Sequence, residues 1–205
     1  MADTTPGMHI RTTRLLLRPL ASDDAELVVA WRNDPQNAEL FLAPPPTLEQ
    51  HLKWFASDRS NRVDYVITLQ ESGEVVGTLN YVLDPAGHTA ETGTLIGSRA
   101  HRGKGIAWEA KLAWTLFGFA ALDIESILVR IRADNERMIR IDEKLGYVHV
   151  GSERLTNAIG APHEYRTLRL DRGRTLPSTG KLRWFNEIPV FLLLAIIWLV
   201  LAKPF

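Results

Sequence analysis

The chain has 205 residues, 45% of them hydrophobic, with 24 basic and 24 acidic side chains and no cysteine. A formal net charge of zero gives no global reason to expect nucleic acid or an acidic partner. The lack of cysteine excludes disulfides, thiolate metal ligands and a cysteine nucleophile. No pair among the six histidines has the i, i+4 spacing of a helical zinc site, so no metal is predicted.

The first half of the chain predicts strands and two helices. Residues 1–10 are polar, which predicts a flexible N-terminus. The first twenty residues contain no apolar run long enough for a secretory signal. Residues 22–24, SDD, predict a helix N-cap with acidic first-turn residues. Residues 47–50 form a capping-box pattern that opens a second helix ending at Phe55. The strands expected here cover residues 13–20, 63–69, 75–83 and 89–97, with a hairpin turn at 71–74.

The second half alternates helices and strands. Helices are expected over residues 106 to about 120 and over 135–145, where Gly146 ends the second one. Strands are expected over residues 126–132, 147–150 and 165–170. Hairpins followed by a β-α-β-α-β segment place the chain in the α/β or α+β class, with a central mixed sheet flanked by helices.

Residues 102–107, RGKGIA, lie between an expected strand and an expected helix. The first N–H groups of a helix have no intrahelical partner, and the helix dipole adds positive charge there. Gly103 and Gly105 lack a Cβ that would block a ligand, while Arg102 and Lys104 supply cationic donors. The segment therefore predicts a site for a phosphate-bearing ligand.

Several motifs together resemble the GNAT superfamily of N-acetyltransferases. Arg102-x-x-Gly105-x-Ala107 is similar to its acetyl-CoA signature, and Asn135 with the later EKLGY of residues 143–147 is similar to its second signature. The segment 14–20 resembles the opening strand of the RimJ/RimL-type branch. The resemblance covers residues 11–171 and implies a GNAT-like, mostly antiparallel central sheet.

The same resemblance implies an activity and a set of site residues. The expected reaction is acetyl transfer from acetyl-CoA to a primary amine by direct attack, with Glu91 as the base that takes the amine proton. A backbone N–H of the strand before the turn would stabilise the oxyanion. The residues expected to bind acetyl-CoA are Leu95, Ile96, Arg102, Gly103, Lys104, Gly105, Ile106, Ala107 and Asn135.

One position departs from the family pattern. Many relatives carry a tyrosine seven residues after the asparagine to protonate the leaving thiolate, whereas this chain has Asp142. An ionised aspartate is a poor proton donor. The alternatives are another group such as Tyr81 or Tyr147, solvent, or weak activity.

The acceptor remains open among a protein N-terminus, a nucleotide-linked aminosugar and a small amine. The segments 31–35 and 51–55 resemble relatives that acetylate nucleotide-linked sugars. A second hypothesis is a non-catalytic acetyl-CoA-binding module tethered to a membrane. A nucleic-acid binder is not favoured, because the sequence lacks a basic patch with aromatic residues.

The C-terminus differs in composition from the rest. Residues 172–183 have linker composition, and residues 184–205 are expected to form a hydrophobic helix that anchors the domain to a membrane. This tail resembles the last helix of HemJ-type membrane proteins over about twenty residues, too few to carry that family's function across. Basic residues before the tail predict a cytoplasmic domain on the inner face of the membrane. A tail folded onto the domain, as in a homodimer contact, is the competing expectation.

Overall fold

A single sheet of eight strands organises the part of the chain that the computed structural model describes, residues 8–85 and 88–173. The sheet is mostly antiparallel, as expected, because only β5 and β6 of the strands below run parallel. The strands are β1 (Ile10–Arg11), β2 (Leu15–Pro19), β3 (Arg62–Leu69), β4 (Val75–Leu83), β5 (Thr89–Ile96), β6 (Ser126–Arg132), β7 (Val148–Thr156) and β8 (Pro162–Asp171). They lie in the order β1-β2-β3-β4-β5-β6-β8-β7.

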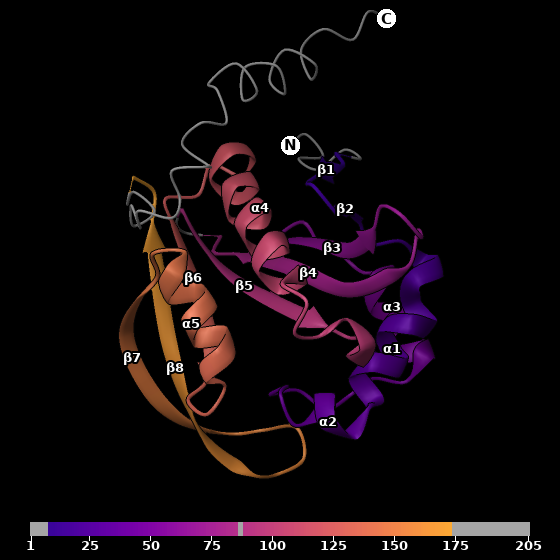
Figure 1. Ribbon diagram of the computed structural model, residues 1–205. Coiled ribbons are helices and arrows are strands. Elements are labelled where there is room, and N and C mark those ends of the chain that lie inside the picture. The colour runs from indigo at the N-terminus through magenta and orange to yellow at the C-terminus, as the bar shows by residue number, and fades with distance from the viewer. Residues whose placement is uncertain (1–7, 86–87, 174–205) are drawn as a thin grey trace, which may run out of the picture. The chain divides into compact units, whose positions relative to one another are not determined.

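The helices fall into two groups. Helices α4 (Ile106–Ala121) and α5 (Glu136–Lys144) lie over the same face of the sheet, whereas α1 (Ala25–Asn33), α2 (Pro35–Ala38) and α3 (Leu48–Phe55) lie together at the other side (Figure 1). The capping box of α3 forms as expected, since Thr47 Oγ1 accepts from the Gln50 amide at 3.2 Å and Gln50 Oε1 accepts from the Thr47 amide at 2.9 Å. Two short 3₁₀ turns, Ser22–Asp24 and Arg99–His101, complete the set.

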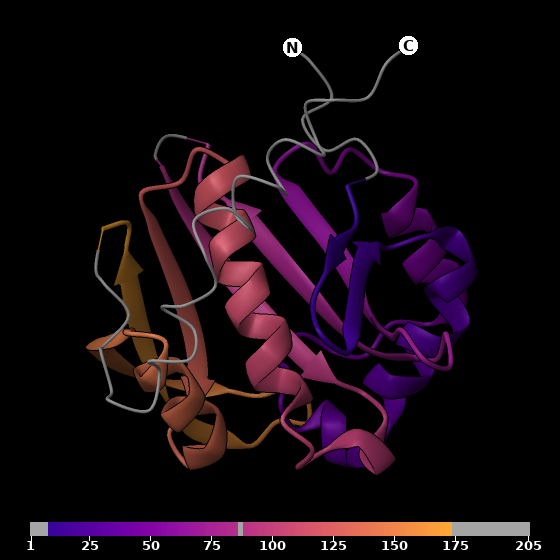
Figure 2. The same cartoon turned by 45° about the horizontal axis from the view of Figure 1, so that its top comes forward.

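An aromatic cluster holds α4 against the sheet. The helix crosses the sheet diagonally (Figure 2). Trp114 stacks on Tyr81 of β4 with ring centroids 4.7 Å apart, and the Tyr81 hydroxyl donates to the Trp114 carbonyl at 3.0 Å. Trp114 Nε1 donates in turn to Thr92 Oγ1 of β5 at 3.2 Å. Polar bonds within a large apolar contact give α4 one defined position relative to β5.

Three local expectations need correction. Strand β1 begins at Ile10, inside the segment expected to be flexible. Asp24 does not cap α1, because its carboxylate is taken by Arg18 at 2.7 Å and by the Ala21 amide at 2.9 Å, and residues 22–24 form a 3₁₀ turn instead. The final hairpin is also longer than expected, since both β7 and β8 extend beyond the predicted ranges.

The expected linker lies mostly, and the hydrophobic tail entirely, beyond residue 173 and so outside the described residues, as does the HemJ-like similarity. Within residues 8–85 and 88–173, no helix is both long enough and apolar enough to cross a membrane.

Candidate functional site

The parallel strands β5 and β6 separate part of the way along. They pair only from Thr89 with Ser126 to Glu91 with Leu128, after which β5 continues with β4 and β6 continues with β8. The facing edges of residues 92–96 and 129–132 therefore bound a gap, which we call the wedge. An unpaired strand edge offers a row of N–H and C=O groups to an extended ligand.

The hydrogen bonds of β5 show which of its backbone groups face the wedge. Thr89 and Gly97 direct their backbone groups to β4, because the Thr89 carbonyl accepts from the Asp84 amide and the Gly97 amide donates to Val76. Backbone direction alternates along a strand. The groups of Thr92, Thr94 and Ile96 consequently face the wedge, whereas those of Leu95 face β4. Ile96 fits the expected backbone contact through its N–H, because its carbonyl accepts from Arg102 Nε. Leu95, which is 9% exposed, contributes its side chain.

The glycine-rich turn leads directly into α4. Gly103 and Gly105 have φ angles of +80° and +79°, and Gly105 is the N-cap of α4 in the left-handed region. No side chain caps this N-terminus, so the N–H groups of Ile106 and Ala107 stay available to an anion. The predicted phosphate-binding turn thus has the backbone conformation that such a site requires.

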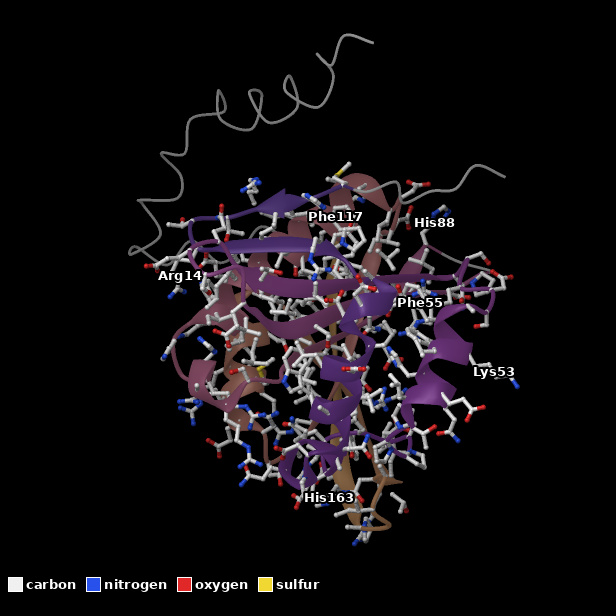
Figure 3. All side chains as sticks on the ribbon, turned by 90° about the vertical axis from the view of Figure 1, so that its right-hand side faces the viewer. Arg14, Lys53, Phe55, His88, Phe117 and His163 are labelled. Atoms are coloured by element: carbon white, nitrogen blue, oxygen red, sulfur yellow. The ribbon has the colours of Figure 1, made fainter. Side chains whose placement is uncertain are left out.

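Two arginines outside the predicted set flank the turn. Arg14 donates to the Lys104 carbonyl at 3.0 Å and forms an ion pair with Glu109 at 2.7 Å, which ties the turn to the segment before β2. Figure 3 labels Arg14 at this edge of the sheet. Arg137, the second residue of α5, is exposed, and its guanidinium would lie 3.8 Å from a Cβ on Gly103. Arg137 is therefore a cation placed over the turn.

The Arg102 side chain bonds groups outside the turn, although the residue lines the turn compartment. Its Nε donates to the Ile96 carbonyl at 3.1 Å, and its Nη2 bonds Asn37 Oδ1 of α2. The guanidinium thus joins the end of β5 to α2. Its N–H groups satisfy the carbonyl at the end of β5 and the buried side-chain amide oxygen of Asn37.

Three hollows meet along the wedge. The turn compartment, about 810 Å³, contains the turn, the start of α4, Ile96, Asn135 and Arg137. The wedge compartment, about 330 Å³, contains Glu91, Thr94, Lys111 and Asn135. The acceptor compartment, about 360 Å³, lies among α1, α3 and β4. Leu95 lines all three, so the compartments adjoin along β5.

The remaining predicted binding residues have different positions. Ile106 is 4% exposed and belongs to the core, while Lys104 is exposed and lies outside the compartments' lining. Asn135 is the N-cap of α5, and its Oδ1 accepts from the Met138 amide at 3.4 Å. Its amide nitrogen is then the group that can reach a ligand in the wedge. Thr94 Oγ1 is buried there without a partner among the described residues.

Glu91 lies where β5 and β6 separate. Its side chain is 46% exposed and lies 3.7 Å from Arg130 Nη1, while Arg130 Nε bonds Glu153 at 2.9 Å. It lines the wedge compartment from the end that is still paired. This placement suits a base that passes a proton to solvent.

The acceptor compartment holds residues that the sequence did not single out as a site. Arg32 lies over the Phe41 ring at 4.3 Å, has a buried Nε without a partner and forms no ion pair within the described part of the chain. Burial and the nearby Arg62 lower the pKa of Arg32 from its ordinary value. His51 is 6% exposed, and its Nε2 has no partner among the described residues. Burial lowers the pKa of His51. Only the resemblance of segments 31–35 and 51–55 could have pointed to this pair.

Asp64, the acidic side chain that lines this compartment, already forms ion pairs with two arginines. Asp64 pairs with Arg62 at 3.0 Å and with Arg59 at 3.3 Å. The net character is therefore cationic, with Arg32 as the unpaired charge. No group of three or more metal-ligating side chains occurs in residues 8–85 and 88–173.

A glycine turn at a helix N-terminus, opening onto a split sheet, defines a class of protein that binds a long phosphate-bearing ligand across its strands. The GNAT acetyltransferase domain matches residues 14–148. An uncharacterized protein of Methanocaldococcus jannaschii is 31% identical over 66% of this chain. The match spans only 28% of that relative's length. The uncharacterized N-acetyltransferase p20 of Bacillus licheniformis is 27% identical over 68% of this chain and 82% of its own.

Solved structures agree with this fold. A domain from Methanocaldococcus jannaschii has a TM-score of 0.64 at 26% identity, covering 78% of this chain and 99% of its own. Spermidine N-acetyltransferase from Vibrio cholerae, solved with CoA and spermine, has a TM-score of 0.73 at 16% identity, covering 80% and 98%. The chain belongs to the GNAT acetyltransferase family and is an acyltransferase by class.

Proposed function

We propose that this protein transfers the acetyl group of acetyl-CoA to a primary amine on an acceptor that also carries an anionic group, with nucleotide-linked aminosugars as the acceptor class. The observation that carries the acceptor class is Arg32, a part-buried guanidinium with no acidic partner among the described residues, in the compartment that adjoins the wedge compartment. A buried unpaired cation costs stability unless a ligand completes it.

The cofactor half of the proposal rests on the turn and the wedge. The N–H groups at the start of α4, together with Arg137, would hold the pyrophosphate. The wedge-facing backbone of Thr92 and Thr94 would pair with the pantetheine arm and stabilise the oxyanion. Asn135 would hydrogen-bond the arm near the thioester.

The acceptor compartment favours one of the three acceptor classes. Trp54 and Phe41 offer aromatic faces beside Arg32 and Arg62. Such a combination suits a base or sugar ring that carries phosphate. A polyamine would bring positive charge against these arginines, which disfavours it.

An acceptor panel tests this proposal. Acetyl-CoA is incubated with nucleoside-diphosphate aminosugars, the same aminosugars without the nucleotide, spermidine and short peptides, and products are measured by mass spectrometry. We expect acetylation of the nucleotide-linked amines with a much higher kcat/KM than the others. Preferential acetylation of spermidine would contradict the anionic acceptor, and tight acetyl-CoA binding without any turnover would favour the non-catalytic module.

Replacing Glu91 with glutamine tests the proposed base. Glu91→Gln keeps the shape but removes the carboxylate that accepts the amine proton, so turnover at neutral pH should fall by roughly a hundredfold or more. Acetyl-CoA affinity, measured by calorimetry, should change little, because Glu91 lies at the paired end of the wedge. Glu153→Gln, which alters the other partner of Arg130, is the matched control. Unchanged turnover of Glu91→Gln across the pH range would show that water, and not Glu91, takes the amine proton.

The tail carries a separate proposal, which rests on composition alone. We propose that residues 184–205 attach the domain to the cytoplasmic face of a membrane. Fractionation of cells without detergent should place the full chain in the membrane pellet and a chain truncated after Asp171 in the supernatant. Equal amounts of both chains in the supernatant would rule the anchor out.

A further inference from the structure

A buried ion pair joins the two helices that cover the wedge. Lys111 Nζ of α4 contacts Asp142 Oδ1 of α5, and the two side chains are 3% and 0% exposed. Burial raises the pKa of Asp142, and the Lys111 charge opposes that rise. A buried pair seldom adds net stability over apolar residues, so its presence needs another reason.

The two members of the pair differ in their access to the cleft. Lys111 lines the wedge compartment together with Thr94, Asn135 and Met138, whereas Asp142 is not among the described lining residues. An ammonium has three N–H donors, and Asp142 lies to one side of it. Contact with Asp142 leaves the other donors of Nζ, which also lies 6.0 Å from the centroid of the Tyr147 ring, for a ligand that enters the wedge compartment.

The phenols of the chain are less suited to this position. Tyr81 and Tyr147 are not among the described residues that line any compartment, and burial raises the pKa of both. Tyr165 does line the wedge compartment. It pairs across the strands with Arg132 and Glu153, which places its ring on the face of Glu91 and Arg130, away from α4 and α5.

We propose that Lys111 is the acid that protonates the departing CoA thiolate, and that Asp142 is a positioning residue that holds Lys111 Nζ in place. This inference rests on the proposed acetyl transfer. The amine nitrogen bonds to the acetyl carbon, the C–S bond breaks, and its electron pair goes to sulfur. One proton moves from Lys111 Nζ to sulfur. The amine proton leaves through the base to solvent, and solvent returns one proton to Lys111.

The test compares acetyl donors whose leaving thiols differ in basicity. Lys111→Met should lower kcat with acetyl-CoA by about a hundredfold or more. With S-acetylthiophenol, whose thiolate leaves without help, the same substitution should cost only a few-fold. Lys111→Arg keeps the charge beside Asp142 but does not release a proton, so it should show the same dependence on the leaving group in a folded protein.

Two controls separate this role from a structural one. Arg18→Met breaks another part-buried ion pair, Arg18 with Asp24, outside the described cleft lining, and should leave the ratio between the two donors unchanged. Lys53→Met removes an exposed lysine that points away from α3 and should do the same (Figure 3). Equal loss of kcat with both donors in Lys111→Met would overturn the proposal, as would a leaving-group dependence found in Tyr165→Phe instead.

A binding measurement keeps the test independent of turnover. If Lys111 donates to sulfur, the wild-type protein binds CoA more tightly than dethio-CoA, and Lys111→Met abolishes that difference while leaving dethio-CoA affinity unchanged. Equal affinities in the wild-type protein would overturn the inference. Failure of the wild-type protein to acetylate any acceptor, with this difference intact, would instead overturn the proposed function.

Discussion

Gly105→Val is expected to weaken acetyl-CoA binding by well over tenfold, which corresponds to more than about 1.4 kcal/mol. Gly105 has a φ of +79°, a conformation that a β-branched residue adopts only under strain. A Cβ here would meet Arg14 Nη2 at 3.4 Å, an ordinary contact, so the protein itself does not exclude the side chain. The loss would come from a distorted turn and from bulk placed where the pyrophosphate would approach.

A matched substitution at a second glycine distinguishes the loss of acetyl-CoA binding from a general effect of backbone strain. Gly160 has a φ of +86° in the turn between β7 and β8, with no atom within 4 Å of an added Cβ. Gly160→Val should therefore lower the melting temperature to a similar degree without changing acetyl-CoA affinity. Titration calorimetry on both folded variants provides the measurement. Wild-type affinity in folded Gly105→Val would exclude the turn as the pyrophosphate site.

The backbone of the cofactor site could be predicted because it depends on local sequence. Glycines that need positive φ, a helix that starts after them and an asparagine N-cap all act within a few residues. The side-chain contacts could not, because they join distant segments. Arg14 and Glu109 are 95 positions apart, and Arg102 and Asn37 are 65 apart. Nothing in the RGKGIA segment shows that its first arginine joins the end of β5 to α2.

The acceptor compartment was harder to predict for a related reason. Arg32 is a polar position in a short helix, and His51 is a polar position in another, so each has an ordinary explanation as a solvated side chain. Only the packing of α1 against α3 and β4 leaves both groups buried and unpartnered. Helix α2 was also missed, since the four residues Pro35–Ala38 are too few to carry a periodic signal.

Arg32→Met is expected to lower kcat/KM for a phosphate-bearing acceptor by roughly thirtyfold to several thousandfold, the equivalent of about 2–5 kcal/mol. The variant loses a charge-assisted contact in a compartment where no other unpaired cation has been found among the described residues. The KM for acetyl-CoA should change less, because Arg32 lines the wedge compartment but not the turn compartment, where the pyrophosphate would bind. Steady-state rates with each substrate varied in turn provide the measurement.

The melting temperature of Arg32→Met provides an independent test of this prediction. The buried Arg32 Nε has no partner in the described part of the chain. Methionine can pack on Phe41 without desolvating a charge, so it should leave the melting temperature equal or higher. Arg59→Met is the matched control, because Arg59 bonds Asp64 beside the same compartment but does not line it. Arg59→Met should lower stability and affect the acceptor little. A less stable Arg32→Met protein with unchanged kcat/KM for every anionic acceptor would make Arg32 a packing residue, and would return the acceptor to the neutral or cationic amines.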